Sequence, residues 1–153
     1  MSLDVNKPED QEMISTHAAY IRENRAEINS ISAGGAVAQT NLTITAGQTS
    51  LVVGTDLSAV GLETVVVTGS GVAVIATITG GTDGQVKIFI FQDANVGLTD
   101  GVKASGKMYL NHLPALSNFA PQQDDVIALR NVGGDGASNH GYWKELFRTL
   151  SVK

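Results

Sequence analysis

The stretch Ile88-Phe89-Ile90-Phe91 contains four apolar residues in a row. Turn residues flank it, with Gly80-Gly81-Thr82-Asp83-Gly84 before and Thr99-Asp100-Gly101 after. A short apolar run between turn signals is typical of a strand that is covered on both faces. We therefore expect a strand over Val86–Gln92, buried either within one domain or between subunits.

Other stretches around this strand are rich in Val, Ile and Thr, the residues enriched in β-strands. Glycine-containing turns separate them at intervals of roughly 8–12 residues, a spacing typical of sandwiches and barrels. The sequence therefore predicts a mainly β chain, with an antiparallel β-sandwich or barrel-like domain over residues 41–153. The other expected strands are Leu42–Thr45, Ser50–Val53, Glu63–Thr68, Ala73–Thr79, Lys107–Asn111, Val126–Arg130 and Trp143–Thr149.

Composition excludes several classes of protein. The chain has 153 residues, the size of one domain, and only 16% of them are charged, against about 25% in typical globular proteins. A net charge of −5 argues against a nucleic-acid partner, and the lack of cysteine excludes disulfides and zinc–thiolate sites. No apolar run approaches the roughly 18 residues of a membrane span, and the polar N-terminus does not resemble an export signal. We expect no membrane partner and synthesis in a cytoplasm.

Charge is distributed unevenly along the chain. Residues 1–31 hold six acids and three bases, whereas residues 32–86 hold only three charged residues, Asp56, Glu63 and Asp83. A segment with so few charges has to bury much of its surface, either against itself or against further copies of the chain.

The N-terminal 33 residues predict a docking arm followed by a helix, joined to the β-domain by a small-residue linker over residues 34–40. Isoleucines recur in this helix at an interval of seven, as in a coiled coil. Two interpretations stay open with equal weight: a helix lying on the β-domain, and a helix at an oligomer seam. The expected seam residues are Ile14, Ile21, Asn24, Ile28 and Ile31.

Side chains that could carry catalysis are present without the spacings that catalysis requires. No two of the three histidines stand at metal-ligand spacing. Aspartates beside the glycine turns lack the pattern of a calcium loop, so we expect them to cap turns. We therefore expect that the protein is not an enzyme, that it has no catalytic or metal-binding residue, and that it binds no cofactor. These histidines and aspartates are His17, His112, His140, Asp83, Asp93 and Asp100.

Aromatic residues make up only 5% of the chain. Trp143 is the one tryptophan, and we expect it to close the core rather than to form a sugar platform with Tyr142. A surface binding site, if the chain has one, would use Tyr109, His112, His140 and Tyr142.

The second half of the chain carries an ordered series of short motifs. Ile78–Gln85 is a strand and glycine turn, Val86–Phe91 is the apolar strand, and Leu98–Gly101 is a further turn. Asp125–Arg130 and a closing Tyr142–Arg148 follow. This layout resembles the β-module of many tailed-phage virion proteins, which include fibre ends and capsid decoration proteins.

The N-terminal stretch Ala19–Asn29 is similar to the short helical lead that precedes such β-modules. The resemblance implies a non-enzymatic virion structural protein, most simply a homotrimeric capsid decoration (cement) or head-fibre protein. Residues 1–33 would then attach it to the major capsid protein or to another virion protein. A trimer also suits the composition, because a closed oligomer covers apolar strands that a monomer exposes.

An alternative role is compatible with the same resemblance. A short tail fibre or a receptor- or glycan-binding tip would bind a host-surface glycan through exposed aromatic residues or a polar pocket. We expect the protein to be made in the host cytoplasm and to reside in the virion under either interpretation.

Overall fold

The computed structural model describes residues 37–110 and 118–151, and every structural statement below refers to them. This part of the chain is built of strands, and the β-domain begins at Val37. The expectation of a mainly β chain is confirmed. The strands are β1 (Val37–Ile44), β2 (Ser50–Val52), β3 (Leu62–Gly69), β4 (Ala73–Ile75), β5 (Thr77–Thr79), β6 (Val86–Phe91), β7 (Val96–Thr99), β8 (Met108–Tyr109), β9 (Asn118–Phe119), β10 (Val126–Val132) and β11 (Tyr142–Thr149).

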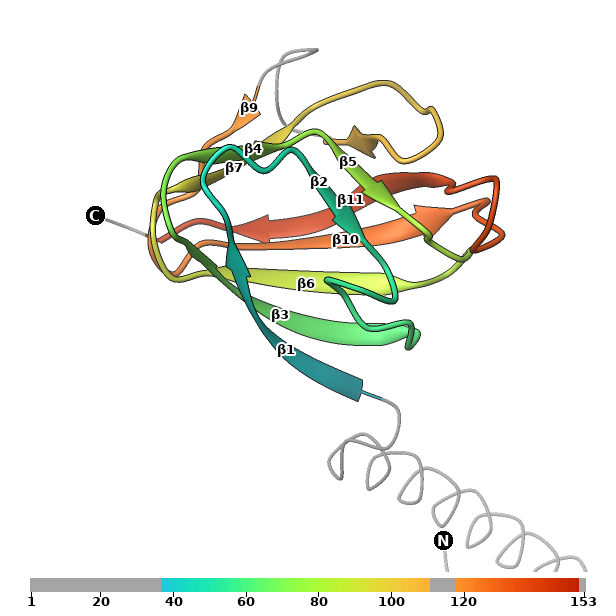
Figure 1. Ribbon diagram of the computed structural model, residues 1–153, viewed down its shortest axis with the longest axis horizontal. Coiled ribbons are helices and arrows are strands. Elements are labelled where there is room, and N and C mark those ends of the chain that lie inside the picture. Colours follow the sequence, from blue (N-terminus) through green and yellow to red (C-terminus); the bar gives the residue numbers. More distant parts are fainter. Residues whose placement is uncertain (1–36, 111–117, 152–153) are drawn as a thin grey trace, which may run out of the picture. The chain divides into compact units, whose positions relative to one another are not determined.

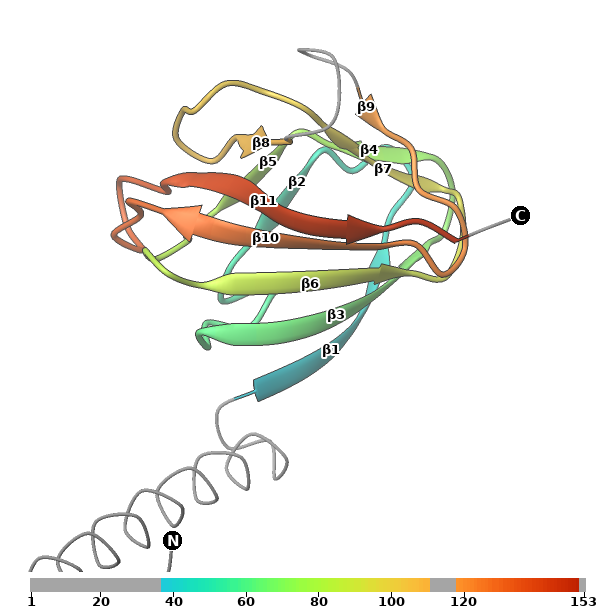
Figure 2. The same cartoon turned by 180° about the vertical axis from the view of Figure 1, so that it is seen from behind.

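The strands form two layers. The main sheet has six strands in the order β1-β3-β6-β10-β11-β8. Two smaller sheets, β2-β5 and β4-β7-β9, lie over one of its faces (Figures 1 and 2). We call the covered face of the main sheet its inner face and the opposite one its outer face.

The antiparallel part of the expectation is wrong, because the sheets are mixed. Five of the eight strand pairs in the described residues are parallel, including β1 with β3 and β3 with β6. Parallel neighbours need a crossover connection, and here the crossovers are strands of the opposite layer. The chain passes through β2 between β1 and β3, and through β4 and β5 between β3 and β6.

The apolar run in β6 is buried on one face only. Phe89 and Phe91 point into the core, where each is 1% exposed, while Ile88 and Ile90 lie on the outer face and are half-buried. Phe91 meets Phe119 of β9 edge to face, with ring centroids 6.0 Å apart. The core between the layers is therefore closed by residues from both.

Several element boundaries differ from the expectation. The expected strand Ala73–Thr79 is divided at Ala76, because β4 pairs with β7 whereas β5 pairs with β2. Residues 37–40, expected in the linker, belong to β1 and pair with β3. Strand β7 was not expected and contains Gly97. A Cβ at Gly97 would lie 3.1 Å from the Phe119 carbonyl oxygen, a tight contact that β9 could relieve only by shifting.

The expected helical seam is not part of this description. Ile14, Ile21, Asn24, Ile28 and Ile31 lie outside the described residues, as do His17 and His112. Among the described residues, the outer face of the main sheet is the surface that could take part in an oligomer.

One buried ion pair stands out on the inner face. Glu63 of β3 and Lys87 of β6 are direct partners in the parallel register, and both side chains are fully buried. The Lys87 ammonium lies 2.7 Å from a Glu63 carboxylate oxygen. Buried charges persist only when they are paired and hydrogen-bonded, so this pair is a structural element of the core.

Candidate functional site

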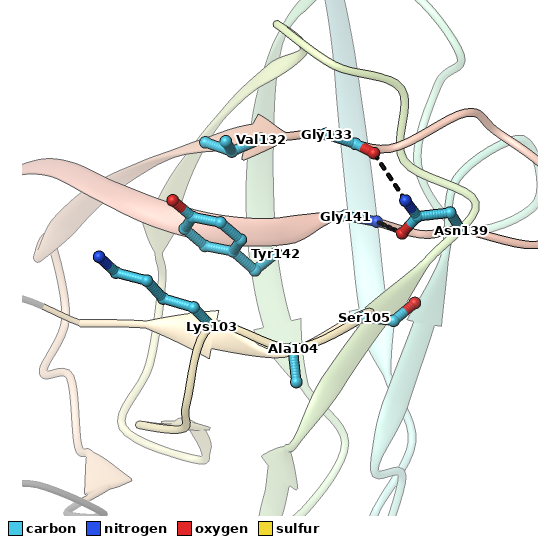
Figure 3. Close-up of a pocket in the computed structure, with 8 residues that line it drawn as sticks. All are labelled: Lys103, Ala104, Ser105, Val132, Gly133, Asn139, Gly141 and Tyr142. Atoms are coloured by element: carbon cyan, nitrogen blue, oxygen red, sulfur yellow. Dashed lines mark hydrogen bonds between the residues drawn. The ribbon is translucent and has the colours of Figure 1, made fainter.

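A shallow pocket opens where β10, β11 and the loop before β8 meet (Figure 3). Its volume is about 180 Å³, and polar groups from all three segments border it. The pocket therefore suits a small polar group rather than a large apolar ligand. The lining residues are Lys103, Ala104, Ser105, Val132, Gly133, Asn139, Gly141 and Tyr142.

The loop between β10 and β11 forms one wall of this pocket and is held by its own side chains. The Asn139 amide donates to the Gly133 carbonyl oxygen (3.0 Å) and accepts from the Gly141 backbone N–H (3.1 Å), as Figure 3 shows. Asp135 accepts hydrogen bonds from the backbone N–H groups of Ala137 (2.8 Å) and Asn139 (3.0 Å). The wall is thus preorganised by local hydrogen bonds.

Asn131 anchors the base of the same loop to the core. Its fully buried amide accepts from the Gly134 N–H (3.0 Å) and donates to the His140 carbonyl oxygen (2.7 Å). A Cβ at Gly134 would lie 2.1 Å from the Gly81 carbonyl oxygen, so only glycine permits this close approach. The glycine-rich stretch at 133–136 therefore serves loop packing.

Protonation of Asp135 is expected to loosen this loop. The backbone N–H groups of Ala137 and Asn139 stabilise its carboxylate and hold its pKa below the ordinary value of 3.8. Because the folded pKa is depressed, the loop contacts are complete above pH 3.8 and are lost as the pH falls through the folded pKa. In an NMR titration, the amide signals of Ala137 and Asn139 should shift with a midpoint below 3.8.

The variant Asp135→Ala is the control for that titration, since it should abolish the shift of both amide signals. A midpoint above 3.8 in the natural chain would contradict the assignment of Asp135 as the acceptor that organises the loop.

Cations and tyrosines lie together beside the pocket on the outer face. Arg130 of β10 is the direct partner of Lys144 of β11, and Lys144 is the partner of Tyr109 of β8. The Lys103 ammonium lies over the Tyr109 ring, 4.9 Å from its centroid. Tyr142 lines the pocket two residues from Lys144. We call these five residues the basic corner.

The structure brings together only part of the surface site expected from the sequence. Tyr109 and Tyr142 both belong to the basic corner, whereas His112 lies outside the described residues. His140 has a structural role, because its Nδ1 accepts from the Gly80 N–H (3.0 Å). Trp143 is fully buried and donates to the Ile78 carbonyl oxygen (3.0 Å), which confirms its expected place in the core.

Sequence reasoning missed the three cations of the basic corner. Arg130 and Lys144 look like ordinary exposed charges at the outward positions of alternating strands, and Lys103 looks like a loop residue. The alternation in β10 and β11 places the first two on one face, but their pairing depends on the register.

The aspartates beside the glycine turns bind backbone amides, but only the contact of Asp93 with Asn95 caps its own turn as expected, and the others reach distant segments. Asp93 accepts from the N–H groups of Gly69 (2.9 Å) and Asn95 (2.8 Å), and Asp100 accepts from that of Leu110 (2.8 Å). Within residues 37–110 and 118–151, no three acidic or histidine side chains are grouped as metal ligands would be. The same ranges contain no helix with the length and apolarity of a membrane span.

Comparison with known proteins gives the chain no family. No family model matches it, and neither the curated proteins nor the solved structures contain a match. The proposals that follow rest on the outer face of the main sheet and on the basic corner.

Proposed function

We propose that this chain is a non-enzymatic structural protein of a tailed-phage virion. In this proposal it forms a homotrimeric capsid decoration or head-fibre protein, attached to the major capsid protein or another virion protein through residues 1–33. The sequence motifs described above favour this class. The proposal of an oligomer is supported by the apolar outer face of the main sheet.

The outer face holds a continuous apolar patch. Successive partners across the strands are Val66, Ile90 and Val126 in one row, and Ile88, Ala128 and Phe147 in the next. Phe147 is 49% exposed, and in the described strands no carboxylate shares this face. Single exposed apolar residues are ordinary, but a contiguous patch marks an interaction site. The outer patch consists of Leu62, Val66, Val86, Ile88, Ile90, Val126, Ala128 and Phe147, of which Ala128 is itself fully buried beneath its neighbours.

The size of the outer patch suits part of a protein interface. Each position on one face of a sheet covers about 4.8 Å by 7 Å, so the members of the outer patch other than Ala128 cover roughly 240 Å². A standard interface buries about 800 Å² on each partner, so the patch would supply its apolar centre and the exposed polar residues of β1 part of its rim.

In this proposal the outer patch is covered by further copies of the same chain. The centre of the patch carries no charge, so further copies can pack there without like-charge repulsion, and interfaces between identical chains are the more apolar class. Beside it, β1 is the edge strand of the main sheet within the described residues, and Gln39, Asn41 and Thr43 lie on its outer side. A closed symmetric oligomer covers both the patch and the edge.

The mass of the protein in solution tests this oligomer. Three chains of 16.0 kDa give 48.0 kDa, the mass that light scattering on a sizing column should report. The variant Ile88→Lys should elute as a folded monomer of 16.0 kDa, because a charge in the centre of the outer patch opposes its burial between copies. Ile88 is already half-buried beside solvent, so the isolated domain tolerates the lysine.

Thr68→Lys is the matched control, since Thr68 lies on the same face of β3 but outside the outer patch. It should keep the mass of the natural chain. A natural chain that stays monomeric, or an Ile88→Lys variant that stays trimeric, would contradict an oligomer built on this patch.

The virion assignment has its own test. Mass spectrometry of purified particles of the phage that encodes the chain should detect its peptides in many copies per particle. Their absence from particles, with the protein present in the lysate, would contradict the assignment whatever the oligomeric state.

A receptor- or glycan-binding tip is the second candidate function, and the basic corner favours it. Tyr109 and Tyr142 lie next to a pocket whose polar groups border an open surface. Saturable binding to a glycan would distinguish this function from an inert decoration protein.

A further inference from the structure

We infer that the basic corner binds an acidic oligosaccharide, one whose sugar units carry carboxylates. This inference rests on the second proposed function, a glycan-binding tip, and names the ligand class and the residues. The oligosaccharide would lie along the row Arg130–Lys144–Tyr109, with one sugar unit entering the pocket beside Tyr142.

The register concentrates positive charge in a small area. Arg130 and Lys144 are direct cross-strand partners, and both side chains are exposed. Like charges directly opposite each other destabilise a sheet. Lys103 adds a third cation to the same place through its contact with the Tyr109 ring. A bound anion would convert this repulsion into attraction.

In the described residues no carboxylate forms an ion pair with these cations, although Asp135 stands in the loop that borders the pocket. Within the described part of the chain, the ion pairs join Lys87 to Glu63 and Arg148 to Glu145, and neither includes a residue of the basic corner. The outer face of the described strands carries no carboxylate, although the whole chain has a net charge of −5. A local excess of positive charge on an acidic protein points to an anionic ligand.

The aromatic and polar groups indicate a carbohydrate. Tyr142 offers a ring face against which the C–H groups of a sugar pack, and both Tyr109 and Tyr142 supply phenol groups that hydrogen-bond. The Tyr109 ring already carries the Lys103 ammonium over one face. Ser105 and Asn139 border the pocket. The Ser105 hydroxyl accepts from the His140 N–H (3.1 Å), so its own O–H can donate to a bound unit, whereas the Asn139 amide is used within the loop. At about 180 Å³ the pocket is smaller than a drug-sized site, and suits a single sugar unit.

A nucleic acid fits the same surface less well. Nucleic-acid sites use a stripe of many Lys and Arg residues to neutralise successive phosphates. The basic corner has three cations, and the adjoining outer patch is apolar. A carboxylated sugar spaces its charges more widely and needs no such stripe.

Calorimetric titration of the full chain with three probes tests the inference. The probes are an oligosaccharide of mannuronic acid, the neutral sugar maltohexaose and an oligothymidine DNA strand. We expect mannuronate to bind, and to bind at least about tenfold more tightly than either other probe, because each charge-assisted contact contributes roughly a factor of ten.

Two variants and a matched control locate the site. Lys144→Gln should weaken mannuronate binding about tenfold, and the double variant Arg130→Gln/Lys144→Gln should weaken it further. Lys107→Gln removes the same charge at a half-buried position outside the basic corner, and should leave the affinity unchanged. Retention of the natural chain's circular dichroism spectrum by each variant shows that it is folded.

Four results would overturn the inference. Tighter binding of maltohexaose would reject the acidic ligand while leaving a glycan-binding tip in place, and tighter binding of oligothymidine would reject the carbohydrate. An equal loss with Lys107→Gln would show unspecific attraction by charge. Failure of both sugars to bind would overturn the glycan-binding function together with the inference.

Discussion

Replacement of Lys87 by methionine is expected to lower the free energy of unfolding by about 3–5 kcal/mol. Lys87 and Glu63 are both fully buried, and their charged atoms lie 2.7 Å apart. Methionine fills much of the lysine volume but supplies no charge. The Glu63 carboxylate would then stay in the core without a cation. Removal of one partner of a buried ion pair destabilises a protein more than removal of both, because it leaves an unpaired charge.

The consequences extend to the connection between β2 and β3. The Ser58 N–H donates to both Glu63 carboxylate oxygens (2.9 and 3.0 Å), and the Thr40 hydroxyl donates to one of them. Lys87 in turn donates to the carbonyl oxygens of Ser58 and Val60. The pair therefore ties this connection to the main sheet, and its loss should loosen the connection as well as the core.

Denaturant unfolding followed by circular dichroism measures the effect. The double variant Glu63→Leu/Lys87→Met removes both charges and should recover a large part of the lost stability. Lys144→Met, at an exposed position, should change the free energy of unfolding by less than about 0.5 kcal/mol. A loss below about 1 kcal/mol in Lys87→Met would mean that the Glu63 carboxylate does not depend on this cation.

Truncation of Trp143 to alanine is the second large change, with an expected loss of about 3–5 kcal/mol. Trp143 is fully buried and joins the two layers, because it stands on β11 and donates to the carbonyl oxygen of Ile78 in β5. Alanine leaves a cavity between the layers and an unpaired carbonyl group. Gly81 packs so closely that a Cβ there would lie 2.7 Å from the indole ring, so the surroundings are fitted to this side chain.

Trp143→Phe separates the two contributions. It keeps an aromatic ring but removes the indole N–H, so its loss should be intermediate, at least about 1 kcal/mol for the unpaired Ile78 carbonyl. Tyr142→Ala, at the partly exposed neighbouring position, should cost clearly less in thermal or denaturant unfolding. An equal loss in Trp143→Ala and Tyr142→Ala would contradict the assignment of Trp143 as the link between the layers.

The strands of this fold follow from residue type, whereas their partners do not. β6 is recognisable from its apolar run, and Trp143 from its size and rarity. Gly69-Ser70-Gly71, however, has the composition of a hairpin turn and instead carries the chain from the main sheet into the opposite layer. A Cβ at Gly69 would lie 2.7 Å from Asn95, a contact between segments far apart in sequence that no local pattern reports.

The basic corner was only partly predictable for a related reason. Tyr109 and Tyr142 are notable in a chain that is poor in aromatic residues, so composition indicates them. The pairing of Arg130 with Lys144 depends on a register that shifts at a bulge between Ala128 and Leu129. A slip of one residue would place either side chain on the other face, so the cluster arises only from the folded sheet.

The direction of β1 has a mechanical consequence. β1 pairs with β3 in parallel over all eight residues, from Val37 with Leu62 to Ile44 with Gly69. If residues 1–33 are anchored to a shell as proposed, tension enters the domain at Val37, and the part of it that acts along the axis of β1 loads the ladder lengthwise. The rungs of this ladder then bear the load together in shear, instead of opening one after another. Such a strand resists detachment of the domain from its anchor.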